Sequence, residues 1–199
     1  MPRRKPFKHH KREIWLQLCE RLDADFFEGK RRRHDRIEAF HGEWMITLDT
    51  FLANDVTWTR MRAPYVNRDD FVFRIFKENV MHRIGKAFGM KDVEVGYPDF
   101  DKQYVIQGSD ERKLRMMFAN PDIRDLISFQ YSMYLALRRD APLFQKKFPK
   151  GVNEVYYQSI GTIANLERLH DLFELFAATL DHLCAIGTAY EDDPEFRYY

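Results

Sequence analysis

Apolar residues in the first part of the chain recur with the period of an α-helix. Between His9 and Glu28, Trp15, Leu18 and Phe26 fall on one stripe, and Gly29 follows as a suitable C-terminal stop. The pattern predicts a first helix over residues 9–28.

The period then changes from 3.6 to 2, which is typical of β-strands. Apolar and polar positions alternate over residues 44–48, 56–60 and 71–76, and a shorter apolar stretch covers residues 37–40. Gly and Asn residues that favour turns separate the first three stretches. We therefore predict a meander of about four antiparallel strands.

The second half of the chain mixes both periods. It predicts helices over 79–88 and 110–119, a short helix or turn from Pro121, and strands over 103–107 and 152–160. Residues 127–140 fit a strand and a helix about equally well.

The most regular pattern covers residues 165–186, where leucines and phenylalanines line one side of a long helix. A helix, a run of strands and then mixed elements indicate an α+β fold. We expect an antiparallel β meander with helices packed on one face and a long C-terminal helix. We also expect a single domain over 1–199, with a basic N-terminal arm at 1–8 and an acidic, aromatic tail at 190–199.

Charge is unevenly distributed, although the net charge is only +1. Residues 1–36 hold 12 of the 32 Lys and Arg residues but only 6 of the 31 Asp and Glu residues. This basic segment includes Arg31, Arg32 and Arg33. It predicts an anionic partner, such as nucleic acid or a membrane surface, or self-association with the acidic remainder of the chain.

The two cysteines, Cys19 and Cys184, are far apart and fall on apolar sides of predicted helices. We expect both to be buried free thiols. No apolar run has the length of a signal sequence core or of a transmembrane segment. These features predict a soluble, cytoplasmic protein.

Arginine residues form a candidate anion-binding site on the predicted strands. Arg60 and Arg62 share one face of a strand, and Arg74 lies on another strand. Guanidinium groups bind phosphates and carboxylates. The alternative is that these arginines pair with Asp49 across the sheet.

The stretch Pro98–Phe118 contains a candidate acidic site. If it were a strand, Asp99 and Asp101 would share a face and could act as an acid–base pair or metal ligands. The alternative is an ordinary turn. Further along, Ser109 is predicted to cap the helix over 110–119 through its side-chain oxygen.

Three groups on the long predicted helix, His170, Glu174 and Asp181, fall close together by rotation about its axis, which suggests metal ligands or simply a polar edge. No nucleotide-binding or nucleophile motif is found. We therefore predict no cofactor and no metal.

Three segments resemble bacterial proteins of an uncharacterised family: Thr59–Pro64, Gly85–Asp92 and Phe100–Gly108. The resemblance covers about residues 35–190. It implies a bacterial cytoplasmic α+β domain, and no functional residue follows from it because the family has no known activity. Some of its members are joined to membrane segments.

These observations favour a non-catalytic binding or assembly module with a protein partner or with itself. One alternative is an enzyme that acts on an acidic or phosphorylated small molecule through the arginines and carboxylates. Another is a nucleic-acid or anionic-membrane-surface binder that uses the basic N-terminus.

Overall fold

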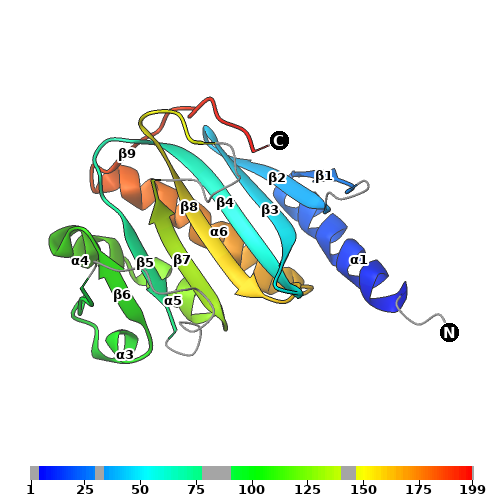
Figure 1. The fold of residues 1–199 in the computed structure, drawn as a ribbon, viewed down its shortest axis with the longest axis horizontal. Coiled ribbons are helices and arrows are strands. Elements are labelled where there is room, and N and C mark those ends of the chain that lie inside the picture. Colours follow the sequence, from blue (N-terminus) through cyan, green and yellow to red (C-terminus); the bar gives the residue numbers. More distant parts are fainter. Residues whose placement is uncertain (1–4, 30–33, 78–90, 140–146, 199) are drawn as a thin grey trace.

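The computed structural model describes residues 5–29, 34–77, 91–139 and 147–198, and the structural statements below refer to these ranges. One antiparallel sheet carries helices on one face (Figure 1). The helices are α1 (Lys5–Leu22), α3 (Pro98–Asp101), α4 (Glu111–Ala119), α5 (Pro121–Ser128) and α6 (Leu166–Ala185). The strands are β1 (Asp25–Phe27), β2 (Arg36–His41), β3 (Trp44–Ala53), β4 (Val56–Asn67), β5 (Phe73–Phe76), β6 (Val105–Gly108), β7 (Met133–Arg138), β8 (Val152–Ile160) and β9 (Ala189–Tyr190).

The strand order is β1-β2-β3-β4-β8-β7-β5-β6, and β9 pairs with the end of β4. All of these pairings are antiparallel. The predicted α+β class, with an antiparallel meander and a long C-terminal helix, is confirmed. The meander is correct for β2, β3 and β4, but wrong for its fourth strand. Since β8 occupies the second edge of β4, β5 pairs with β7 and β6 instead.

The first helix differs from the prediction at both ends. It begins at Lys5 and ends at Leu22, after which Asp23 adopts a left-handed conformation with φ of 50°. The chain then enters β1, which contains Phe26. Phe26 had matched the helical period because one apolar residue fits either a helix stripe or a strand face, so periodicity alone extended the helix too far.

The later elements follow the predictions more closely. Strand β8 has the predicted bounds, and Asn165 caps α6 by accepting a hydrogen bond from the backbone N–H of Arg168. The ambiguous stretch 127–140 divides into the end of α5 and the strand β7. The helix predicted over 79–88 lies outside the described residues.

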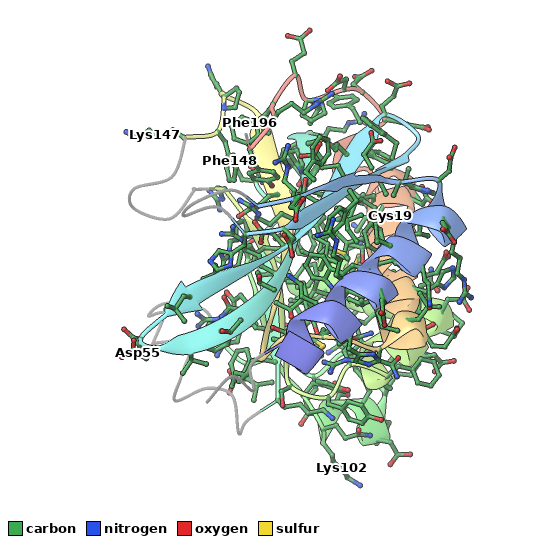
Figure 2. All side chains as sticks on the ribbon, turned by 90° about the vertical axis from the view of Figure 1, so that its right-hand side faces the viewer. Cys19, Asp55, Lys102, Lys147, Phe148 and Phe196 are labelled. Carbon is green, nitrogen blue, oxygen red and sulfur yellow. The ribbon has the colours of Figure 1, made fainter. Side chains whose placement is uncertain are left out.

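The hydrophobic core lies between the sheet and the helices. It contains Trp15 of α1, Phe118 of α4, Ile127 of α5 and Phe176 of α6, packed against strand residues such as Met61. In Figure 2, α1 and the α6 ribbon behind it lie on the same side of the sheet. None of the helices described is long and apolar enough to cross a membrane.

The end of β4 changes its partner, and this change directs the C-terminal tail. The ladder between β3 and β4 ends at the Thr47–Arg62 pair, two residues before Pro64. Proline has no N–H to donate, so it is found where a strand edge is unpaired. Further along β4, Val66 pairs with Tyr190 of β9. β9 therefore lies on the edge of β4 where the pairing with β3 has ended, and residues 191–198 continue from there.

Candidate binding face

The face of the sheet opposite the helices, called here the outer face, carries polar and aromatic side chains. Alternation along the strands directs them away from the core. A second, smaller cluster of buried residues, separate from the main core, lies on this face and consists of Phe76, Tyr134, Ala136 and Tyr156. Charged residues surround the cluster: Asp49, Arg60, Arg62, Arg74, Arg138 and Glu154.

The pairing of the strands separates the three arginines of the candidate anion-binding site. Arg62 is opposite Tyr156, which is opposite Ala136, which is opposite Arg74. Adjacent strands lie about 4.8 Å apart, so the Arg62 and Arg74 backbones are separated by about 14 Å. Arg60 and Arg62 lie together, whereas Arg74 belongs to the other half of the face.

Asp49 binds both Arg60 and Arg62. The Arg60 Nε and Nη2 donate to its two carboxylate oxygens at 2.8 and 2.6 Å, and Arg62 Nη2 donates to Oδ2 at 3.0 Å. Asp49 and Arg62 are each only 3% exposed. This is the cross-strand pairing that the sequence allowed as an alternative to anion binding, and it fixes both guanidinium groups in place.

Arg74 takes part in a different set of contacts. Its Nε donates to the Gln107 side-chain oxygen, and the Gln107 amide in turn donates to Asp92. These residues lie on β5, β6 and the bridge that pairs with β6. Arg74 is therefore held on the part of the outer face formed by β5 and β6, away from Arg60 and Arg62.

A buried carboxylate, Glu154, lies on the outer face near the start of β8. Glu154 is 1% exposed, and the hydroxyl of Tyr198 donates to its Oε2 at 2.8 Å. Burial raises the pKa of the Glu154 carboxyl, and the guanidinium of Arg138 opposes that shift. Arg138 Nη1 lies 4.0 Å from Oε1.

The guanidinium of Arg138 stacks on aromatic rings. Its central carbon is 3.2 Å from the ring centroid of Tyr156 and 5.4 Å from that of Tyr134. The Arg138 side chain keeps 21% of its surface exposed. Stacking on a ring holds a guanidinium in a fixed orientation, and an oriented guanidinium is suited to binding carboxylate or phosphate.

The C-terminal tail, residues 191–198, crosses the outer face. The ring of Tyr198 lies 3.8 Å from the Arg62 guanidinium, and Phe196 makes an edge-on contact with Phe148. Figure 2 shows Phe148 and Phe196 together, on the side of the sheet away from Cys19 of α1. The tail thus covers the part of the outer face where Glu154 is buried.

Asp99 and Asp101 do not form the candidate pair that a strand would have given. Both lie in the short helix α3. The carboxylate of Asp101 accepts hydrogen bonds from the backbone N–H groups of Val95, Gly96 and Tyr97, so it organises the preceding turn. The strand interpretation failed because proline at position 98 equally suits the first turn of a helix.

Asp99 lies beside an open pocket of about 320 Å³. The pocket is also lined by Tyr97, Gln103, Arg124 and Asp125. Asp101, Arg60 and Arg62 are not among its lining residues. The groups that the enzyme hypothesis would combine are therefore separated.

The three groups weighed in the sequence as metal ligands or a polar edge, His170, Glu174 and Asp181, are not brought together. His170 lies 3.7 Å from Glu174, but Asp181 binds His41 of β2 at 2.9 Å. Asp181 lies eleven positions after His170 in the helix, a rise of about 16 Å, so a shared rotational angle did not mean proximity. Among the described residues, no three His, Cys, Asp or Glu side chains are grouped to hold a metal ion.

Basic residues of the N-terminal segment that the structure describes pair with nearby acids. Lys11 binds Asp35 at 3.2 Å, and Arg12 binds Glu28 at 2.6 Å. Arg21 binds Glu167 of α6 at 2.8 Å. Arg31, Arg32 and Arg33 lie outside the described residues.

Sequence reasoning missed Arg138, Glu154 and Tyr198. The alternation in β7 and β8 was a usable signal for the first two. Arg138 is next in sequence to the core residue Leu137 and Glu154 to the core residue Val155, so both are directed to the other face of the sheet. The register Arg138–Glu154 between these strands was not readable from the sequence. Tyr198 belongs to a segment with no periodicity.

No protein-family model and no curated protein matches the chain. The fold is similar to the crystal structure of the mycobacterial trehalose monomycolate transport factor A, TtfA, with a TM-score of 0.53. The match covers 87% of this chain and 94% of that chain at 6% sequence identity. At this identity the likeness is one of fold alone.

Proposed function

We propose that this chain is a non-catalytic binding module whose outer face binds an acidic segment of a protein partner. The observation that carries the proposal is the stacking of Arg138 on Tyr156, with 3.2 Å between the guanidinium carbon and the ring centroid, while 21% of the Arg138 side chain stays exposed. Its carboxylate contact, Glu154, is 4.0 Å away, at the limit of an ion pair. A carboxylate from a partner would bind this oriented guanidinium at closer range.

Two acidic groups named in the sequence analysis, Asp49 and Asp101, have structural roles. Asp49 binds two arginines, and Asp101 binds three backbone N–H groups. A carboxylate occupied in this way is a poor general base, which favours binding over catalysis. The protein of similar fold is named a transport factor, and a non-catalytic role for this chain agrees with that name.

A cytoplasmic location in bacteria is part of the proposal. Cys19 and Cys184 are both free thiols, as is usual in a reducing compartment.

The experiment uses a decapeptide of glutamate as the acidic probe and a decapeptide of glutamine as its uncharged control. We expect amide NMR shifts over residues 133–138 and 152–160 with the acidic peptide only. Arg138→Ala should weaken binding about tenfold, which corresponds to about 1.4 kcal/mol. The matched control is Arg115→Ala, because Arg115 is an exposed arginine of α4 that is paired with Glu111.

Equal affinity of the Arg138→Ala variant and the unchanged protein would contradict the proposal. Shifts confined to the helices would also contradict it. Tight binding to anionic vesicles or RNA at about 150 mM salt, where non-specific affinity is normally weak, would favour the basic N-terminal segment as the binding site instead.

A further inference from the structure

The attachment of the C-terminal tail resembles that of a bound peptide more than that of a strand. After the Val66–Tyr190 pair, residues 191–198 form no helix or strand. No backbone–backbone hydrogen bond joins them to the other described residues. In peptide recognition, such a segment is held by its side chains, and it can be exchanged when another segment offers the same groups.

Two aromatic residues of the tail, spaced two apart, contact the sheet and the segment before β8. Phe196 packs edge-on against Phe148, with ring centroids 5.2 Å apart. Tyr198 lies over the Arg62 guanidinium and donates its hydroxyl hydrogen to Glu154. We call the surface formed by Phe148, Arg62 and Glu154 the tail slot. Its chemistry selects an apolar ring followed by a phenol.

The tail carries its own local fold. Arg197 donates two hydrogen bonds to the Asp193 carboxylate, at 3.0 and 2.9 Å. The Glu195 N–H donates to the same carboxylate at 2.8 Å, and Glu195 has a φ of 49°. These contacts lie within the tail, so a separate peptide of this sequence has the same means of adopting the bound shape.

One carboxylate oxygen of Glu154 in the tail slot accepts no hydrogen bond from the tail. Glu154 Oε1 is buried and accepts no hydrogen bond from the described residues, with Arg138 Nη1 4.0 Å away, while Oε2 accepts from Tyr198. A buried acceptor without a donor costs free energy, because it has lost its hydrogen bonds to water. A ligand that brings a second N–H or O–H to this carboxylate would recover that cost, which the tail does not.

We propose that the tail slot is a peptide-binding site that the chain's own tail fills until a partner segment displaces it. The partner segment is acidic and carries two aromatic residues two positions apart, as the tail itself does, with Glu191, Asp192, Asp193 and Glu195 before its aromatic pair. The proposal rests on the proposed function, because the slot adjoins Arg138 on the outer face through Glu154.

The covalent attachment of the tail determines how strongly it competes with a partner peptide for the tail slot. A segment on a short tether competes at an effective concentration of about millimolar. A partner peptide with micromolar intrinsic affinity therefore binds the unchanged protein much more weakly than it binds a protein whose tail has lost its aromatic groups.

The experiment uses the full chain with Phe196→Ala and Tyr198→Ala combined, called the unlatched variant. The probe is a fluorescent peptide with the sequence of residues 190–198, and the control peptide carries the same two alanine substitutions. Fluorescence anisotropy should show binding to the folded unlatched variant at least tenfold tighter than to the unchanged protein. The control peptide should not bind, and adding Glu154→Gln should weaken binding of the probe.

A folded unlatched variant that does not bind the probe would overturn the proposal, and so would equal binding of both peptides. Loss of the native circular dichroism spectrum in that variant would assign the tail to the core and also overturn it. A concentration-dependent dimer of the unchanged protein that the two alanines abolish would identify a second copy as the occupant, against the proposal. The glutamate decapeptide contains no aromatic residue, so its binding tests the proposed function separately.

Discussion

The hydroxyl of Tyr198 donates a 2.8 Å hydrogen bond to Glu154, a carboxylate that the sheet and the tail leave only 1% exposed. The bond joins the C-terminal tail to the first part of β8. It also places a group that normally prefers water inside the protein. Several properties of the molecule depend on this pair.

Removing the hydroxyl alone tests the bond. Tyr198→Phe keeps the ring over Arg62 but leaves Glu154 without its donor, and an unmet buried acceptor costs about 1–3 kcal/mol. Urea denaturation should show a loss of unfolding free energy in this range. Tyr131→Phe is the control, because Tyr131 is 72% exposed and should change nothing. Equal stability of both variants would show that the bond contributes nothing.

Glu154 should make stability fall as the pH rises. Burial raises its pKa in the folded protein above that in the unfolded chain. The folded state therefore holds the proton more tightly, and the contribution is fully present below the unfolded pKa of about 4.3. It is lost as the pH rises through the folded pKa.

The Glu154→Gln variant isolates this effect from that of the other acids. It cannot ionise, so its stability relative to the unchanged protein should increase from pH 4 towards pH 8. Thermal or urea unfolding at several pH values measures the difference. A relative stability that decreases with pH would mean that the arginines lower the Glu154 pKa more than burial raises it.

The cap of α4 provides a third prediction. Asp110, not Ser109, is the N-cap, and its carboxylate accepts from the backbone N–H of Lys113 at 3.0 Å. Asp110→Ala should cost about 0.5–2 kcal/mol in unfolding free energy. Ser109→Ala, at an exposed position, should cost about 0.5 kcal/mol or less. A larger loss of stability for Ser109→Ala than for Asp110→Ala would mean that Ser109 is the N-cap, as the sequence predicted.

The choice between Ser109 and Asp110 as the N-cap could not be made from the sequence. Serine and aspartate are both good caps, so adjacent candidates cannot be separated by residue type. The structure separates them because the Ser109 side chain accepts a hydrogen bond from Val72 N–H, extending the contact between β5 and β6. That contact joins distant segments and leaves no local pattern.

The same distinction applies to the fold and to the candidate binding face. Strand β8 and helix α6 were predictable because their patterns lie within one continuous segment. The pairing of β4 with β8, and hence the meeting of Arg62, Glu154 and Tyr198, depends on long-range register. Single-sequence alternation identifies which face a residue takes but not its neighbour on the next strand.

The cysteines give the last prediction. Cys19 is 8% exposed, and burial, with Asp25 and Glu20 nearby, raises its pKa to about 11. Cys184 is only half-buried, contrary to the expectation that both thiols would be buried, although burial raises its pKa as well. Since the thiolate is the reactive form, Cys19 has little of it near neutral pH.

Alkylation of the native protein with iodoacetamide at about pH 8, a value below the pKa of an ordinary thiol, should therefore modify Cys184 before Cys19. Mass spectrometry of the digested protein identifies the modified residue at each time. In Cys184→Ser, labelling of the native protein should be nearly abolished, and urea should restore it by exposing Cys19. Labelling of Cys19 at the rate of a free thiol would mean that the contact between α1 and the core opens readily, since Cys19 belongs to the main core cluster.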